Sequence, residues 1–287
     1  MVLMVVFSHL VALLALSPYF FSWTGVGLAV VGSFLSALGI NLCYHRMLAH
    51  GGLSCSKRFE HALAMLGVMA NQFGPAYWVA IHRRHHHFAE EDRDPHSPTR
   101  GFSWSHIGWI FAVSKNTDQQ IIMERYAKDL LNDPFYAWLE KDGIWGRFIP
   151  VAWIGLYAAG ALVVYLQGGT GAEINRFGLS LVVWGAAVRT VAVWHITFSV
   201  NSFCHIWGYR SYQTADDSRN NPIFGIISFG EGWHNNHHAF PRSARHGLRW
   251  WELDMTWLVI KALAGCKLVD IVDAQAAIPP RGDWFAK

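Results

Sequence analysis

The sequence predicts an all-α integral membrane protein, in which four transmembrane helices carry a histidine-rich helical cap on the cytosolic side. Three observations lead to this fold class. Hydrophobic residues make up 52% of the 287 positions and charged residues only 15%, against about 25% charged residues in an average soluble domain. Several apolar stretches approach the length that crosses a bilayer. Most of the sixteen histidines gather between and after these stretches.

Two apolar stretches predict the first pair of spanning helices, at residues 2–21 and 23–42. A helix needs about 20 mostly apolar residues to cross the hydrocarbon layer, and neither stretch contains Lys, Arg, Asp or Glu. Pro18 is expected to help end the first helix. A secretory signal peptide is the alternative for the first stretch. It lacks a basic n-region and a convincing cleavage site, however, and a second apolar helix follows at once.

The second pair of spanning helices is predicted at residues 148–167 and 177–200, with a short connection between them. Arg189 falls inside the last stretch. Because a charged group is costly in lipid, we expect Arg189 to face protein or a polar cavity.

Two other apolar stretches, 61–81 and 255–272, are not expected to span. The second carries Lys261, Lys267 and Asp270, which suits an amphipathic helix at the interface. If the first crossed the bilayer, the histidines before and after it would lie on opposite sides. Pro75 also interrupts it, so we expect it to lie against the membrane on the side of the histidines.

The distribution of basic residues predicts the orientation. Of the 23 Lys and Arg residues, 12 lie between Arg46 and Arg147 and nine lie from Arg210 onward, whereas the loop between the third and fourth spans has only Arg176. By the positive-inside rule, the segments 43–147 and 201–287 and both termini are cytoplasmic. No repeat or linker divides the chain, so we expect one membrane domain over residues 1–287. The net charge of +3 gives little support for a nucleic-acid partner.

Most of the histidines fall into four short segments next to the predicted spans. The segments are HRMLAH (45–50), HRRHH (82–86), NSFCH (201–205) and HNNHH (234–238). In an HxxHH run on a helix, the histidines stand at i, i+3 and i+4 and can converge on a metal site. Histidines five residues apart, as in HRMLAH, do not share a face of a regular α-helix. Either a helix end brings these two rings together, or they turn toward different metals.

Nine imidazoles on one side of a membrane predict a metal centre. A lone histidine near a membrane is more often packing than a ligand, but two HxxHH runs together with HxxxxH are hard to explain in that way. Nine ligands exceed the four that zinc usually takes, so two metals sharing them is the economical interpretation. Imidazole suits iron, zinc, copper or nickel, and the residues alone do not choose the metal. The predicted ligands are His45, His50, His82, His85, His86, His205, His234, His237 and His238.

Carboxylates near the histidine runs are candidates to orient the ligands, because a ligating imidazole usually donates its other N–H to a carboxylate or carbonyl. Asp94 and Glu231 flank histidine runs and are the predicted partners. Glu90 and Asp254 are further candidates, although Glu90 lies in an acidic stretch that fits a solvated loop equally well. Outside the ligand set we place His87 and His96, and we expect packing or surface roles for His9, His61, His106, His195 and His246.

Together these segments closely resemble the membrane Δ9 fatty acyl desaturases, the family of stearoyl-CoA desaturase and the bacterial and cyanobacterial acyl-lipid desaturases. The similarity includes the three histidine boxes and the stretches GPAYWVAIHRRHHHFAEEDRDPHSPTRGFSWSHIGW, VNSFCHIWGYRSYQT and GEGWHNNHHAFPRSARHGLRWWELD. It extends from about Gly39 to Trp257. The resemblance implies two iron ions held by the nine histidines, with Asn201 reaching one of them through a water. It also implies four spans beneath a cytosolic cap, with the acyl chain in a bent internal tunnel.

The same resemblance implies the activity and the partners. The reaction would use O2 and two electrons to place a cis double bond, at Δ9 in this family, in a saturated chain carried as an acyl-lipid or acyl-CoA. No separate acid or base is implied. The segments GPAYW and RSARHGLRWWELD are more similar to the acyl-lipid branch than to the animal acyl-CoA branch. No cytochrome b5-like segment is recognisable, so we expect electrons from a separate ferredoxin or cytochrome b5-like protein. An acidic donor or an anionic head group could meet Arg83, Arg84, Arg242 and Arg245, although ordinary surface is expected for any one of them.

Two other functions remain compatible with the histidine pattern. A membrane di-iron hydroxylase would add oxygen to a lipid or alkane instead of removing a second hydrogen, and the spacing does not exclude it. A metal transporter would need ligands near the middle of the bilayer, whereas these histidines lie beyond the ends of the spans. The acyl carrier, the chain length and the donor are left open by the sequence.

Overall fold

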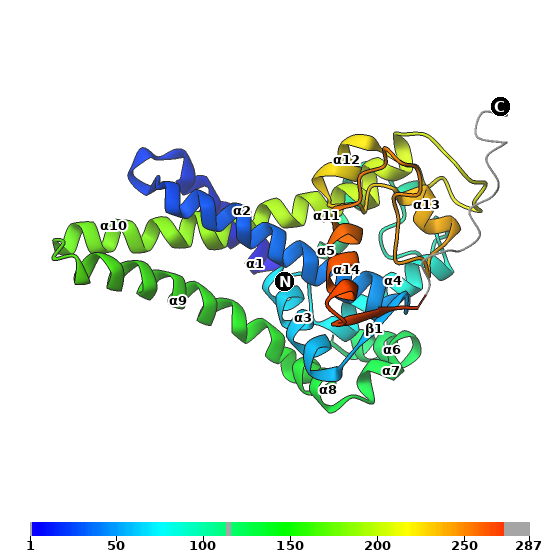
Figure 1. The fold of residues 1–287 in the computed structure, drawn as a ribbon, viewed down its shortest axis with the longest axis horizontal. Helices are drawn as coiled ribbons and strands as arrows, with labels where there is room; N and C mark the ends of the chain where they lie inside the picture. Colours follow the sequence, from blue (N-terminus) through cyan, green and yellow to red (C-terminus); the bar gives the residue numbers. More distant parts are fainter. Residues whose placement is uncertain (1, 113–115, 273–287) are drawn as a thin grey trace.

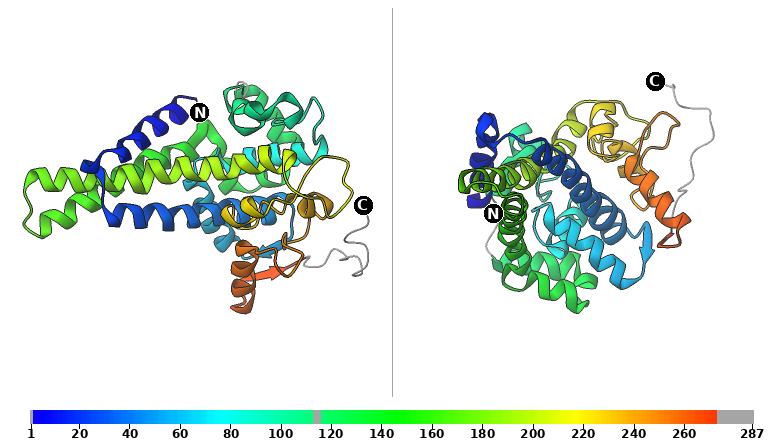
Figure 2. Two further views of the ribbon diagram at one scale, coloured as in Figure 1. Left: turned by 90° about the horizontal axis from the view of Figure 1, so that it is seen from above. Right: turned by 60° about the vertical axis from the view of Figure 1, so that its left-hand side comes forward.

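The computed structural model describes residues 2–112 and 116–272, which form an elongated, mostly helical molecule (Figure 1). Long helices make up one end of the molecule, and shorter helices and loops gather at the other (Figures 1 and 2). The long helices are α1 (Val2–Leu13), α2 (Trp23–Leu38), α9 (Ile144–Leu166), α10 (Gly171–Val182) and α11 (Arg189–Ile206).

Within the described residues, three helical stretches are long and apolar enough to cross a membrane, namely Trp23–Ala49, Pro134–Leu166 and Gly171–Ile206. They include the second, third and fourth predicted spans. The first predicted span, 2–21, is shorter than expected. Its helix covers Val2–Leu16, comprising α1 and η1 (Leu14–Leu16), and η2 (Pro18–Phe20) follows after a break at Ser17. Ser17 is extended, because its side chain caps the turn that Pro18 begins.

The long hairpin of α9 and α10 turns within a few residues. Gly168 adopts a left-handed conformation with φ of 76°, which ends α9. Thr170 and Glu173 then form a reciprocal capping box that begins α10. The π-helix η7 (Val183–Val188) joins α10 to α11, so the two form one continuous apolar rod.

Arg189 faces protein, as expected for a charge in an apolar helix. Its side chain is buried and donates to the Ser36 hydroxyl at 2.6 Å and to the Met69 carbonyl at 2.7 Å. Gly32 of α2 makes room for it, since a Cβ there would lie 2.7 Å from the Arg189 side chain. The arginine therefore ties α11 to α2 and to the end of α3.

The other end of the molecule is built from short helices around the histidines. The stretch 61–81 falls into two helices, broken at Gly74-Pro75 as predicted. The helices of this region are α3 (Lys57–Met69), α4 (Pro75–His87), η4 (Pro98–Arg100), η5 (Trp104–Gly108), α5 (Trp109–Phe111), α6 (Asn116–Tyr126), α7 (Lys128–Leu131), α8 (Pro134–Glu140), η6 (Lys141–Gly143), α12 (Pro222–Ile227), α13 (His234–Ala239) and α14 (Met255–Gly265).

One small element was not expected from the sequence. The strands β1 (Leu53–Cys55) and β2 (Val269–Ile271) pair in an antiparallel ladder. The second half of the stretch 255–272 is therefore not helical. The pairing fixes the segment after α14 against the segment that follows the first histidine run.

Close packing between α2 and α3 positions the first histidine run. After Leu38 the helix continues as the π-helix η3 (Gly39–Ala49), all of whose residues are buried. A Cβ on Gly39 would lie 2.1 Å from the Gly67 backbone nitrogen of α3, so only glycine permits this approach. Apolar side chains of η3, α3, α4 and α11, such as Tyr44, Val68 and Trp194, form the core beside the histidines.

Candidate metal centre

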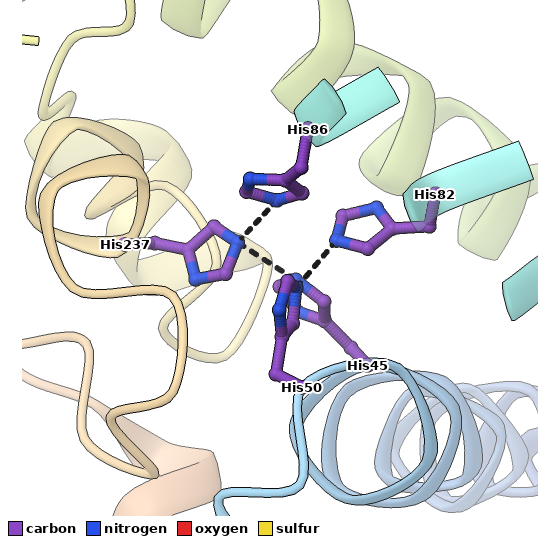
Figure 3. Close-up of side chains that lie close together, drawn as sticks. All are labelled: His45, His50, His82, His86 and His237. Atoms are coloured by element: carbon purple, nitrogen blue, oxygen red, sulfur yellow. Dashed lines mark hydrogen bonds between the residues drawn. The ribbon is translucent and has the colours of Figure 1, made fainter. Parts of the chain in front are cut away.

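Two groups of histidine side chains meet where η3, α4, α11 and α13 come together. Within each group, one ring nitrogen from every histidine lies within 4.8 Å of the others. The first group, called here the five-histidine cluster, contains His45, His50, His82, His86 and His237 (Figure 3). The second, called the four-histidine cluster, contains His85, His205, His234 and His238. These are the nine histidines that the sequence predicts as ligands.

The π-helix explains how His45 and His50 reach the same cluster. The backbone N–H of His50 donates to the His45 carbonyl at 3.2 Å, which is the i→i+5 bond that defines a π-turn. The wider turn brings the two rings onto one side, with centroids 5.0 Å apart. Of the two alternatives left by the sequence, the structure therefore shows convergence rather than separation.

Each HxxHH run is divided between the clusters, which corrects the expectation that its three histidines converge on one site. On α4, His82 and His86 belong to the five-histidine cluster and His85 to the other. On α13 the arrangement is reversed, since His237 joins the five-histidine cluster while His234 and His238 do not. Residues at i and i+4 stay together, whereas the residue at i+3 turns to the neighbouring site.

The two clusters lie directly beside each other. The rings of His86 and His238, one from each cluster, have centroids 4.5 Å apart. Within the five-histidine cluster, the Nε2 atom of His237 lies 3.0 Å from Nε2 of His45 and 2.9 Å from Nε2 of His86 (Figure 3). In the other cluster, Nε2 of His205 lies 3.1 Å from Nε2 of His234. The Nε2 atoms thus point inward.

Four of the nine histidines donate their Nδ1–H group to a buried or half-buried carboxylate. The pairs are His45 with Glu231 at 2.5 Å, His85 with Asp94 at 3.0 Å, His205 with Glu90 at 2.9 Å and His238 with Asp216 at 2.7 Å. A histidine that donates from Nδ1 keeps its Nε2 lone pair for a metal. The donor set therefore fits two imidazole-bound metal ions.

These pairs also test the carboxylates that the sequence proposed. Asp94 and Glu231 contact histidines as predicted, and Glu90 does so instead of lying free in solvent. Asp254 binds the Arg46 side chain and accepts from the backbone N–H of His246, so its histidine contact is with the backbone and not with an imidazole ring. Asp216 was missed, because it lies in a polar loop and no histidine run flanks it.

Glu231 is held by a buried ionic network. The Arg46 guanidinium, which is fully buried, donates to Glu231 at 2.8 Å and to Asp254 at 2.9 Å. Asp254 also accepts from the Trp257 backbone N–H at the start of α14. Arg46 thus links the first histidine run to the segment after the last one. This role of Arg46 could not be predicted from the sequence, where the residue is marked only by its place inside HRMLAH.

Burial affects the protonation of histidines in both clusters. It lowers the pKa of His50, His82, His86, His234 and His237 well below the usual range, and it lowers that of His238 to about 4. Although burial opposes the effect, the nearby imidazoles hold the pKa of Asp94 below its usual range. At neutral pH these six rings are therefore neutral, which is the form that binds metal.

The other histidines occupy several environments. His87 is exposed. His96 packs against His85, with ring centroids 4.4 Å apart. His61 pairs with Asp133 at 3.0 Å, and the rings of His9, His195 and His106 are hydrogen bonded in a row. His246 is fully buried, with its Nδ1 3.5 Å from Glu231 and its ring 4.5 Å from that of His237. Its position beside the five-histidine cluster was not expected.

Two narrow apolar cavities adjoin the clusters. The first runs between α2 and α11, past Ala37, Ile40 and Val193, to His45 and His234. The second runs from Gln72 and Phe73 to Trp109. Both are lined by Trp78, His82, Thr197 and Asn201, so they meet beside the five-histidine cluster. Gln72 donates to the Thr197 hydroxyl at 3.0 Å at this junction.

Asn201 is the residue that the resemblance expects to reach a metal through a water. It lies on α11 one turn before His205, and it lines both cavities together with His82. His234 lines the first cavity as well. Asn201 therefore lines these cavities together with the candidate ligands His82 and His234.

Comparison with known proteins adds an independent line of evidence. Residues 21–268 match the family described as fatty acid desaturase. The chain is 40% identical over 273 residues to the "sn-2 palmitoyl-lipid 9-desaturase" of Nostoc sp. (strain 36), a match that covers 94% of this chain and 88% of that protein.

Two plant proteins are similarly related. The chain is 41% identical over 254 residues to the "Icosanoyl-CoA 5-desaturase" of Limnanthes douglasii, covering 88% of this chain and 66% of that protein. It is 43% identical over 264 residues to the chloroplastic "Palmitoyl-monogalactosyldiacylglycerol delta-7 desaturase" of Arabidopsis thaliana, covering 91% and 65%. The chain thus spans about two thirds of the length of these plant relatives. The three names differ in the acyl carrier and in the position of the double bond.

Proposed function

The chain belongs to the fatty acid desaturase family and is an oxidoreductase that acts on fatty acyl chains, and we propose that it forms a cis Δ9 double bond with a di-iron centre. The balanced reaction is –CH2–CH2– + O2 + 2 e⁻ + 2 H⁺ → –CH=CH– + 2 H2O. One observation carries the proposal. The nine histidines predicted from sequence gather in two adjacent clusters beside a narrow apolar cavity.

The ligand set suits two ions. Five imidazoles would hold one iron and four would hold the other, with Asn201 completing the second site through a water. Glu231, Asp94, Glu90 and Asp216 would fix the tautomers of their histidines. When bound, the two irons would activate O2 and allow removal of a hydrogen from each of two neighbouring carbons.

The protein's own contribution is to position the chain. The two narrow cavities would hold the two halves of one acyl chain, and their junction at Trp78, His82 and Thr197 would hold the carbons that react. The Gln72–Thr197 hydrogen bond would hold the cavity wall in place at this junction. Because the cavities are narrow and mainly apolar, they would limit the access of water to the reacting carbons.

The three long apolar helices associate the protein with a membrane. In our proposal the shorter helix Val2–Leu16 is the fourth span. The whole chain then forms one multi-pass domain, with the histidine centre and both termini in the cytoplasm. Electrons would come from a separate ferredoxin or cytochrome b5-like protein. The names of the relatives leave coenzyme A, phospholipid and galactolipid open as carriers of the acyl chain.

The decisive experiment expresses the chain in a host that lacks unsaturated fatty acids and determines the products by mass spectrometry. We expect cis-9 unsaturated chains in the lipids and two irons per purified chain. Hydroxylated chains would instead support the hydroxylase alternative. Saturated chains alone, with iron bound and an electron donor supplied, would overturn the proposal.

A further inference from the structure

His246 is a buried histidine at the edge of the five-histidine cluster, and its ring is unpaired. The residue is 1% exposed, and in the described part of the chain neither of its ring nitrogens makes a hydrogen bond. Its ring centroid lies 4.5 Å from that of His237 and 5.3 Å from that of His45. A buried polar group without a partner is costly, so such an arrangement is uncommon in the absence of a further role.

The backbone of His246 is fixed by groups that also support the centre. Its N–H donates to Asp254 at 2.8 Å, and its carbonyl accepts from the Asn236 side chain at 2.9 Å. Asp254 is bound to Arg46, and Asn236 immediately precedes His237 in the chain. The ring therefore cannot leave the edge of the cluster unless these hydrogen bonds break.

One nitrogen of the His246 ring faces Glu231. Its Nδ1 lies 3.5 Å from the Glu231 oxygen Oε2, which also accepts from His45. The other oxygen, Oε1, accepts from Arg46. An ionised carboxylate can only accept, and its two oxygens offer about four lone-pair sites. Oε2 therefore has room for a second N–H group, and Nδ1 of His246 is the donor that faces it.

The other nitrogen of the ring finds a complementary group on His237. Nε2 of His237 points into the cluster, and its Nδ1 faces away from the other four rings (Figure 3). Because a metal would take the Nε2 lone pair, Nδ1 carries the proton, and this buried N–H has no acceptor among the described residues. If His246 donates from Nδ1 to Glu231, its Nε2 is a lone pair that lacks a donor. The two neighbouring rings thus carry one unpaired donor and one unpaired acceptor.

The separation of these two rings is compatible with a hydrogen bond between them. His45 and His237, whose Nε2 atoms are 3.0 Å apart, have ring centroids 4.4 Å apart. The hydrogen-bonded rings of His9 and His195, at 3.0 Å between nitrogens, have centroids 5.3 Å apart. The 4.5 Å between His237 and His246 lies within this range. Rotation of the rings about their own side-chain bonds can therefore join them.

A third metal site is the alternative explanation for His246. One ligand atom each of His45, Glu231 and His246 lie within 4.8 Å of one another. The Arg46 guanidinium, however, already supplies a cation at 2.8 Å from Glu231. His45 uses its Nδ1–H for the bond to Glu231 and would have to lose that proton to bind a metal there. Charge and proton count therefore disfavour a third metal ion.

We propose that His246 is a positioning residue of the five-histidine site, which donates from Nδ1 to Glu231 and accepts at Nε2 from His237 when metal is bound. This inference rests on the proposed function, since it assumes a metal ion in that cluster. Ligating imidazoles usually donate their second N–H to an acceptor, and His246 would supply this acceptor to His237. Because Glu231 also orients His45, one buried residue would connect the orientations of two ligands.

The test measures iron affinity by chelator competition, together with Mössbauer spectra, in the purified protein without substrate. His246→Phe keeps a ring of similar size and removes both nitrogens. It should weaken iron binding at the five-histidine site about tenfold and shift only the Mössbauer component that His86→Ala removes. The metal-free variant should unfold at the wild-type temperature or above it, because no paired ring nitrogen is lost. His61→Phe is the matched control, since His61 belongs to neither cluster.

Two conservative variants separate the two contacts of the ring. An Asn side chain can place a donor near the position of Nδ1, and a Gln side chain can place an acceptor near that of Nε2. His246→Asn and His246→Gln should therefore each recover part of the affinity that His246→Phe loses. In a Glu231→Gln background, His246→Phe should weaken iron binding less than it does in the wild type, because the two residues act through one shared contact.

The remaining outcomes would each contradict one hypothesis. Wild-type iron affinity in His246→Phe would overturn the inference, even where the wild type is an active desaturase. A weaker affinity accompanied by lower stability of the metal-free protein would also overturn it, because it would show a purely structural role. Three irons per wild-type chain, falling to two in His246→Phe, would show a metal site instead. A wild type that binds two irons but forms no double bond would contradict only the proposed function.

Discussion

The five-histidine and four-histidine clusters are built by different means. In the five-histidine cluster, within the part of the chain that the structure describes, only His45 donates to a carboxylate, and that carboxylate is fixed by the fully buried Arg46. In the four-histidine cluster three of the four rings donate to Asp94, Glu90 and Asp216. The five-histidine cluster is therefore held mainly by its number of histidines and by the helices that carry them. The four-histidine cluster is held mainly by hydrogen bonds from its rings to carboxylates. The difference predicts that two metal ions bound in these clusters would differ in how strongly each depends on its carboxylates.

The largest expected effect comes from removing one ligand from each cluster. His86→Ala and His234→Ala should each lower the iron content from two to about one per chain and reduce desaturation to background. Mössbauer spectra should lose a different component in each variant, because the ligand sets differ. His87→Ala is the matched control, since His87 is exposed next to His86. Loss of both irons in either variant would mean that the clusters are not separate sites.

The second largest effect is expected from breaking the ionic network that Arg46 forms with Glu231 and Asp254 beside the five-histidine cluster. Arg46→Met leaves Glu231 and Asp254 buried without their cation, which typically costs about 3–5 kcal/mol of stability. Thermal unfolding of the detergent-solubilised protein, with and without iron, measures this loss. Arg58→Met should leave the unfolding temperature unchanged. An equally stable Arg46→Met protein would show that the network does not support the cluster.

A smaller and selective effect is expected from the carboxylates. Because Glu231 is the one carboxylate paired with a ring of its cluster in the described structure, Glu231→Gln should weaken iron binding there by about 100-fold. Asp216→Asn leaves the His85 and His205 pairs intact, so about tenfold weaker binding at the other site is expected. Competition with a chelator measures both affinities. Equal losses at both sites in each variant would contradict the separate tuning.

The smallest effect is expected at Asn201, which would reach its iron only through a water. Asn201→Ala should weaken iron binding at the four-histidine site by only a few-fold, since a bulk water can replace the bridge. The five-histidine site should be unaffected. The same competition assay checks this, and a loss as large as that in His234→Ala would show direct ligation.

Much of the centre could be predicted from the sequence, because helical spacing is a local property. The pairing of His82 with His86 and of His234 with His238 follows from the i, i+4 rule. The turn of His85 and His237 to the neighbouring site does not follow, since it depends on where a second metal site lies. Asp216 and His246 were missed for the same reason. Both reach the centre through loops, whose paths depend on long-range packing.

The fold, too, could be predicted from the sequence only in part. Length and hydropathy located α2, α9 and the α10–α11 rod, because a span is defined by one continuous stretch. Length and hydropathy overestimated the length of the first helix, which ends early at Ser17 and Pro18. The strands β1 and β2 have three residues each, too few for a sequence pattern. The cavities could not be predicted, because they are made by side chains from four or more separate segments.

The π-turn of η3 has a consequence for how this chain tolerates length changes. An α-helix advances by about 100° per residue, so α winding over the five residues from His45 to His50 would place the two rings on different sides of the helix. Deleting one residue between them would leave histidines at i and i+4, which share a face once the turn winds as an ordinary α-helix. Inserting one residue would instead rotate the two rings apart by about 100°. The first site should therefore tolerate a one-residue deletion in this turn better than a one-residue insertion.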